Sequence, residues 1–264
     1  MIQTARKRKY RIFSPLFIFM MFAFLYFPMI ILIIFSFNSR SFPAPWNSFT
    51  TQWYQKLFME RELWESFFNS FTVASFSTLI CLTLTCFMLY YLSRGGRIDK
   101  WMNLFYLNLV LPEAILGVAL ISYFGMTNIP LGLTTIIIAH SIVGLGFTIP
   151  IAYVRFKELD PAILEASRVV GATATQTFFR VLIPLIKPVL ITSGLMIFII
   201  SFDDFVLSYF CSGAGAQTLS LYLIYSIRYG ISPVVNALAS ILLVFTLVLV
   251  GIFFSMGARA RRLL

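Results

Sequence analysis

The chain is 264 residues long, 59% of its residues are hydrophobic, 11% are charged, and its mean hydropathy is +0.90. Water-soluble domains have about 25% charged residues and about 45–50% apolar ones, so this composition excludes an ordinary soluble protein and a disordered one. The net charge is +10, which nucleic-acid-binding proteins can also have, so the positions of the charges have to decide between nucleic acid and membrane.

The first apolar segment follows a basic N-terminal stretch and carries no charge from 12 to 39. A cleaved signal peptide has an apolar region of about 7–15 residues, so we expect this longer segment to remain as an uncleaved transmembrane helix.

The later apolar segments complete a set of six expected spans. Pro112 is expected to kink the third span. The apolar stretch 218–229 is too short to cross a bilayer, and we expect it to form a re-entrant or interfacial helix on the outer side. The six expected spans are 12–36, 66–92, 103–125, 131–154, 188–210 and 235–258.

The basic residues show which connections face the cytoplasm. Of the 20 Lys and Arg residues, 16 lie in one set of connections and four in the other. Cytoplasmic connections of membrane proteins are enriched in Lys and Arg, and here the enrichment alternates correctly through six spans. We therefore expect an all-α polytopic membrane protein whose residues 1–264 form one transmembrane domain with both termini in the cytoplasm. The basic charge then reflects topology and contact with lipid, and no nucleic-acid partner is expected.

The cytoplasmic loop 155–187 is predicted to form a helix, a tight turn and a second helix. Asp160 is a favourable N-cap before Pro161, and Gly171 suits the left-handed position after a helix that ends near 170. Thr175 is predicted to cap the second helix, which is expected to end near Pro184. Such a loop either connects two spans or docks a partner, and long ordered connections are often functional.

The loop resembles the EAA loop of ABC importer permeases. Glu165-Ala166-Ser167 is followed after three residues by Gly171, and after nine more by Val181-Leu182-Ile183-Pro184. The family pattern has Ala, Ile and Leu where this chain has Ser167, Val181 and Ile183. The resemblance implies a type I ABC importer permease fold, in which this loop forms the coupling helix that docks on a separate ATPase. The coupling residues that it implies are Asp160, Glu165, Ala166, Ser167, Gly171 and Pro184.

Other segments are similar to the spermidine/putrescine permeases, and to the second permease of their pair. The segments are Asn69-Ser70, 111–117, 201–208 and 218–222. The resemblance implies polyamine transport in a bacterial inner membrane. It also implies a heterodimer with a second homologous permease, two ATPase subunits and a periplasmic substrate-binding protein.

The chain has no sequence feature that supplies energy or catalysis. No lysine follows a glycine, so a P-loop is excluded, and ATP and Mg are expected on the partner ATPase. No catalytic residue, metal site or bound cofactor is predicted. Cys81, Cys86 and Cys211 match no zinc or redox spacing and are expected to pack as small apolar residues. His140, the only histidine, is expected either to pack and hydrogen-bond within the protein or to line the transport path.

Three carboxylates lie at membrane depth: Glu113, Asp203 and Asp204. Each would cost about 2.5–3.5 kcal/mol at the bilayer centre, so such groups usually face a cavity or a partner. Asp203 is 16 residues beyond Lys187, about 24 Å of helix, which predicts a position towards the outer leaflet. The two aspartates point about 100° apart, so one is expected to face a cation path while the other pairs or caps a helix. Structural pairing of these acids is the alternative.

Three tyrosines, Tyr209, Tyr222 and Tyr225, lie near the expected outer end. Their rings could contact a cationic solute, or they could belong to the aromatic belt at the membrane surface. Three other functions are open: an ABC permease for another small solute, an ion-coupled carrier, or an inert scaffold. A carrier predicts inverted repeats and no docking loop, and a scaffold would not need three buried acids.

Overall fold

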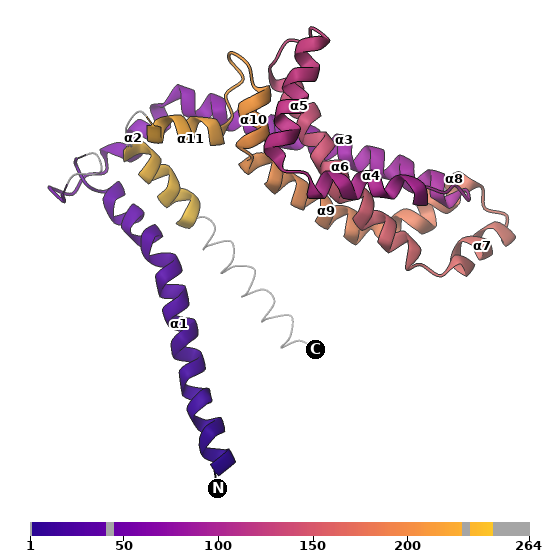
Figure 1. Cartoon of the computed structure of the whole chain (residues 1–264), viewed down its shortest axis with the longest axis horizontal. Coiled ribbons are helices and arrows are strands. Elements are labelled where there is room, and N and C mark those ends of the chain that lie inside the picture. Colours follow the sequence, from indigo (N-terminus) through magenta and orange to yellow (C-terminus); the bar gives the residue numbers. More distant parts are fainter. Residues whose placement is uncertain (1, 41–44, 229–232, 245–264) are drawn as a thin grey trace. The chain divides into compact units, whose positions relative to one another are not determined.

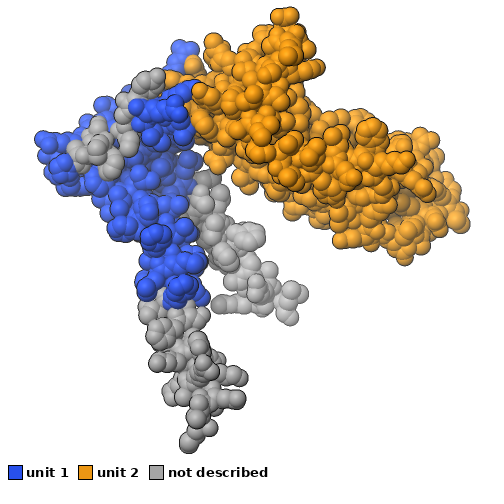
Figure 2. All heavy atoms as spheres, viewed as in Figure 1, with its two compact units in different colours: residues 1–61, 223–264 blue, residues 62–222 orange. Residues whose placement is uncertain are grey.

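The computed structural model describes residues 2–40, 45–228 and 233–244 (Figure 1). The described residues form helices and, apart from them, an isolated bridge between Asn38 and Phe49. The chain divides into two compact units, residues 1–61 with 223–264 and residues 62–222 (Figure 2). The labelled elements are α1 (Ile2–Ser36), α2 (Gln52–Met59), α3 (Arg61–Ser93), α4 (Asp99–Val110), α5 (Glu113–Met126), α6 (Leu133–Lys157), α7 (Pro161–Val169), α8 (Ala174–Thr177), the π-helical turn η1 (Phe178–Leu182), α9 (Ile183–Asp203), α10 (Val206–Cys211) and α11 (Leu219–Arg228).

The first unit contains α1, whose segment Phe17–Ser36 is apolar enough to cross a membrane. The end of α1 is tied to α2 by polar contacts. Ser36 Oγ lies 2.7 Å from the Tyr54 hydroxyl, and Trp53 Nε1 donates to the Asn38 carbonyl over 2.7 Å. These bonds satisfy polar groups just where the apolar helix ends, as a membrane-spanning helix requires.

The second unit is organised around α6, which packs against α4, α9 and α10, while α5 packs against α10. Helices α3 and α6 meet through small side chains. Ser77 and Cys81 donate to carbonyls of α6, and Thr85 bonds the Thr148 hydroxyl over 3.0 Å. Small residues that carry hydrogen bonds let membrane helices approach closely.

Long apolar helices lie at several of the expected spans. Among the described residues, four are long enough to cross, or five if the bent pair α4 and α5 counts as one span. The four are Phe17–Ser36, Arg61–Ser93, Leu133–Lys157 and Ala174–Asp203. Of the sixth expected span, 235–258, the helix Pro233–Val244 is described, and 245–258 lies outside the described residues.

The expected third span, 103–125, is wrong as a single kinked helix. Helices α4 and α5 are bent by 106° at the break between them. Leu111 and Pro112 are both extended, with ψ near 130°. Leu111 is extended because the residue before a proline avoids the helical region. Glu113 therefore starts a new helix.

The expected span 188–210 has different bounds. Helix α9 begins at Ile183 and ends at Asp203, Asp204 is extended with ψ 128°, and the short α10 follows. The helix predicted within 218–229 is present as α11. Both breaks, at Pro112 and at Asp204, place a carboxylate where a helix starts or ends.

Candidate functional site

A small pocket brings together the carboxylates of two broken helices. It is lined by Glu113 from the start of α5, His140 from α6, and Ser201 and Asp204 from the end of α9. The other lining residues are apolar or glycine: Val143, Gly144, Ile197, Ile200 and Leu207. The cavity volume is about 10 Å³, which is room for about one water molecule, so the site is a cluster of convergent polar groups with apolar walls.

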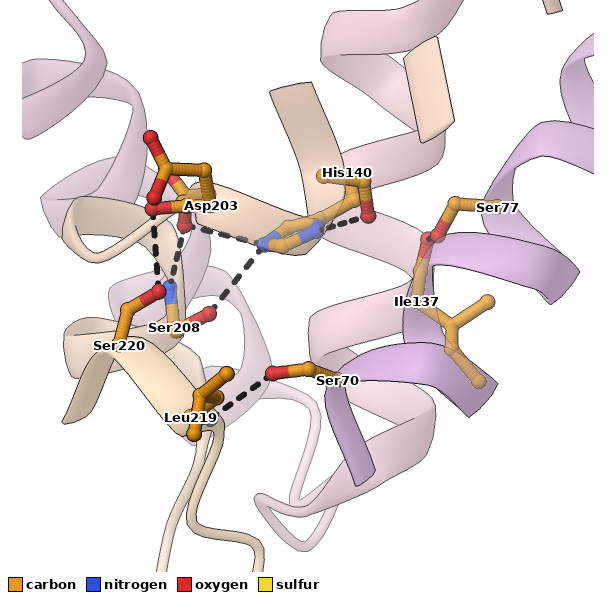
Figure 3. A network of polar contacts seen from close by, with 10 residues as sticks. Ser70, Ser77, Ile137, His140, Asp203, Ser208, Leu219 and Ser220 are labelled. Carbon is orange, nitrogen blue, oxygen red and sulfur yellow. Dashed lines mark hydrogen bonds and ion pairs between the residues drawn. The ribbon is translucent and has the colours of Figure 1, made fainter. Parts of the chain in front are cut away.

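Asp204 is one of the lining residues and is held by hydrogen bonds, and Figure 3 shows its partners His140 and Ser208. Its Oδ2 accepts from the backbone amide of Ser208 over 3.0 Å and lies 3.1 Å from His140 Nε2. The bond to Ser208 caps the start of α10. The Asp204 side chain is 8% exposed, so it is paired and nearly buried. Asp204 therefore pairs and caps a helix, and the same side chain also lines the pocket.

Asp203 has a different environment from its neighbour. It is exposed, and its backbone carbonyl accepts from the Ser220 hydroxyl over 3.0 Å (Figure 3). Glu113 is also exposed and faces the pocket. Asp203 and Asp204 thus lie at one helix break, and Glu113 shares a pocket with Asp204, whose side chain is the nearly buried one.

The three tyrosines have different environments. Tyr209 lies on α10 and is 47% exposed, with its ring 5.7 Å from the Phe205 ring. Tyr222 is buried in the second unit, and Tyr225 belongs to the first unit. Of the three, Tyr209 is therefore the exposed aromatic side chain nearest in sequence to the break.

The loop 155–187 begins as expected. Asp160 Oδ1 accepts from the Ala162 amide over 2.9 Å, which confirms Asp160 as the N-cap, and Pro161 opens α7. No residue of α7 is buried, and Glu165 and Ala166 face solvent. An exposed, capped helix with this composition is free to meet a partner.

The turn after α7 is closed by glycine. Gly171 has φ +88°, and its amide bonds the Arg168 carbonyl while the Ala172 amide bonds the Ser167 carbonyl. This is the Schellman pattern, in which a left-handed residue satisfies the last carbonyls of a helix. The predicted position of Gly171 is confirmed.

Two side chains of α7 hold the loop in place, one through a contact inside the loop and one through a contact with α3. The Ser167 hydroxyl lies 2.8 Å from the Thr177 hydroxyl of α8, and the Arg168 guanidinium donates to the carbonyl of Ser93 at the end of α3. A cation at the C-terminal end of a helix is favourable. The serine that replaces the third residue of the EAA pattern therefore makes a specific contact.

Two predictions about the second loop helix are wrong. Thr173, not Thr175, is the cap: its hydroxyl accepts from the Gln176 amide, and the Gln176 side chain accepts from the Thr173 amide. The helix also does not end near Pro184. It passes through η1 into α9, because the wide π turn accommodates a proline that cannot donate to an earlier carbonyl.

The sequence does not predict the contacts of Ser201, Ser208 and Arg168. Ser201, Asp204 and Ser208 are spaced three and four residues apart, which puts side chains on one face of a helix. That spacing was the available signal for a polar cluster. Arg168 has no such signal, because its partner is a backbone carbonyl 75 positions earlier in the chain.

The comparisons with known proteins agree with this architecture. The family model described as binding-protein-dependent transport system inner membrane component matches residues 82–262. The chain belongs to this family. It is thus a multi-pass membrane permease subunit of an ABC importer.

Similar proteins cover most of the permease. It is 34% identical over 233 residues to the spermidine/putrescine transport system permease protein PotC of Escherichia coli (strain K12), covering 87% of this chain and 88% of that one. It is 32% identical over 231 residues to the putrescine transport system permease protein PotI of the same strain, covering 84% and 82%.

Two solved structures share the fold. A bacterial ABC transporter involved in the import of the acidic polysaccharide alginate has a TM-score of 0.72 at 16% identity, covering 96% of this permease and 97% of that chain. The inward-facing MetNI methionine ABC transporter has a TM-score of 0.51 at 23% identity, covering 76% and 94%. These likenesses support the type I ABC importer permease fold expected from the sequence.

Proposed function

We propose that this permease forms half of the membrane pathway of an ATP-driven importer for the polyamines spermidine and putrescine. The observation that carries the proposal is the pocket in which Glu113 and Asp204 meet at two helix breaks. The names of the similar permeases at 32–34% identity point to the same substrates.

The lining of the pocket has the chemistry that a flexible polycation would need, although its cavity of about 10 Å³ would have to widen to admit one. Polyamines carry ammonium groups separated by apolar methylene chains, and the lining combines two carboxylates with apolar residues such as Val143, Ile197 and Leu207. Carboxylates in the membrane are costly unless they are paired or face a cavity. An ammonium group passing the break would offset that cost while it is bound, and the exposed carboxylate of Asp203 would attract cations towards the same place.

The energy is proposed to come from other subunits. A second homologous permease would complete a heterodimer, two ATPase subunits would bind ATP and Mg, and a periplasmic binding protein would deliver the solute to the bacterial inner membrane. The permease itself would bind no cofactor. Helix α7 is proposed to dock on the ATPase through Glu165, Ala166 and the turn at Gly171, with Asp160 and Ser167 holding the helix in place. Pro184 would lie where the loop continues into α9.

The test is uptake of labelled spermidine and putrescine. Cells that lack this gene and every other polyamine importer are compared with the same cells after the gene is restored. Restored uptake that excess unlabelled diamine inhibits supports the proposal and ranks the two substrates. Equal uptake in both strains removes the polyamine assignment and favours an ABC permease for another small solute.

A further inference from the structure

His140 contacts the break after α9 with both of its ring nitrogens. Nδ1 lies 2.6 Å from the Ser201 hydroxyl, Nε2 lies 3.1 Å from Asp204 Oδ2, and Ser208 Oγ lies 3.5 Å from Nε2 (Figure 3). The His140 side chain is 2% exposed. One residue of α6 therefore connects the end of α9, the break itself and the start of α10.

The partners determine which nitrogen donates. An ionised carboxylate can only accept hydrogen bonds, so Nε2–H donates to Asp204. In the neutral ring Nδ1 then accepts from the Ser201 hydroxyl, which can turn to donate. Asp204 Oδ2 receives the Ser208 amide as well, so two donors occupy this oxygen. Neither bond uses Oδ1.

We propose that His140 is a positioning residue for Asp204 in the cation path. It holds Oδ2 so that the carboxylate keeps one orientation and leaves Oδ1 for an ammonium group of the substrate, and Glu113 lines the same pocket. This role rests on the proposed polyamine transport. Without the imidazole, the Asp204 side chain would have only the Ser208 amide to orient it, and the binding step would lose affinity while the translocation machinery stayed intact.

Two amide substitutions separate the contacts of the ring. The amide of Gln reaches the position of Nε2 and can donate to Asp204, whereas the shorter Asn reaches the position of Nδ1 and retains only the Ser201 contact. We expect His140→Asn to raise the KM of uptake about tenfold with less than about a twofold change in Vmax, as for loss of a hydrogen bond to a charged group. We expect His140→Gln to stay within about twofold of wild type. Ser141→Ala is the matched control, since that hydroxyl bonds Ile137 within α6.

A double-mutant cycle adds a readout that a merely structural histidine would not change. If His140 acts through Asp204, adding His140→Asn to Asp204→Asn raises KM no further than about twofold. The proposal would be overturned if the KM increases of the two single variants multiplied in full in the double variant. It would also be overturned if His140→Asn left the KM unchanged. If His140→Asn does not accumulate in the membrane, Ser201→Ala decides, because a raised KM supports the positioning role and an unchanged KM refutes it. Uptake by the wild-type protein is measured in parallel, so its absence refutes the polyamine function and is distinct from a failure of the His140 role.

Discussion

At the scale of single residues, two adjacent carboxylates have opposite environments. Asp204 is nearly buried with two donors on one oxygen, while Asp203 is exposed. The helix ends between them, and that break rather than the 100° turn of a continuous helix sets their directions. The two residues are therefore expected to contribute differently to transport.

We predict that Asp204→Asn raises the KM of polyamine uptake about tenfold or more, and that Asp203→Asn has a smaller effect in the same direction. An asparagine at 204 can still accept from His140 and Ser208 through its amide oxygen, so the loss reports the missing charge. Initial rates at several substrate concentrations, normalised to the amount of protein in the membrane, measure both. Unchanged kinetics in both variants would assign the acids to structural pairing.

Much of this site could be predicted from the sequence. Three acids in apolar segments identify themselves, because charge is rare in the membrane. The role of His140 could not be predicted, since its partners Ser201 and Asp204 lie 61 and 64 residues away. The packing of α6 against α9 and α10 brings His140 to these partners. The contacts support the first expected role of His140, which is hydrogen bonding within the protein.

At the scale of elements, broken helices position the polar groups. Transporters often form substrate sites where membrane helices are discontinuous, because backbone groups are then free to line a cavity. Here α5 starts at Glu113 and α10 starts after Asp204. The sequence predicted the weak point at Pro112 but not the 106° bend, because the bend depends on how α5 packs against α10.

The end of α10 depends on a glycine. Gly213 has φ +59°, and a Cβ there would lie 2.7 Å from the Leu131 carbonyl oxygen. We predict that Gly213→Ala lowers the thermal stability of the purified protein clearly more than Gly215→Ala. Both residues have positive φ, which costs about 1–2 kcal/mol for alanine, but a Cβ at Gly215 meets nothing within 4 Å. Equal melting temperatures for the two variants would mean that the contact with Leu131 relaxes freely.

The turn after α7 gives a test of coupling. We predict that Gly171→Asp reduces uptake more than about tenfold while the protein still reaches the membrane, because a charge at this exposed turn disturbs docking on the ATPase. Gly171 has φ +88°, and a Cβ there would meet nothing within 4 Å. The substitution therefore acts through the left-handed backbone conformation and through the added charge. Uptake is measured per amount of membrane protein.

Gly171→Asn is the control for the backbone, because asparagine has nearly the same size and tolerates the left-handed region. It should retain most of the uptake. Normal uptake by the aspartate variant would refute the coupling role of the turn. An equal loss in both variants would attribute the effect to side-chain size.

At the scale of the whole molecule, hydropathy predicted the long helices and missed the interruptions. Segments such as Arg61–Ser93 and Leu133–Lys157 are apolar over a full bilayer width, so their sequence alone defines them. The continuity from α8 through η1 into α9 could not be predicted, because proline normally ends a helix and here a π turn accommodates it. The number of crossings thus depends on whether the bent pair α4 and α5 spans the membrane once or returns to the side it came from.

Cysteine labelling from one side of the membrane answers that question. Thr51 and Ala162 are exposed, and between them lie α3, the α4–α5 pair and α6. If the pair crosses once, the chain crosses three times between these positions and they face opposite sides. We predict that an impermeant maleimide labels Thr51→Cys in intact spheroplasts and Ala162→Cys only after lysis. Cys81 and Cys211 are buried, so replacing the half-buried Cys86 leaves little background labelling.

Labelling of both positions from outside would make the α4–α5 pair re-entrant. Labelling of Ala162→Cys alone would invert the orientation that the 16 basic residues predict, and would place α7 away from any cytoplasmic ATPase.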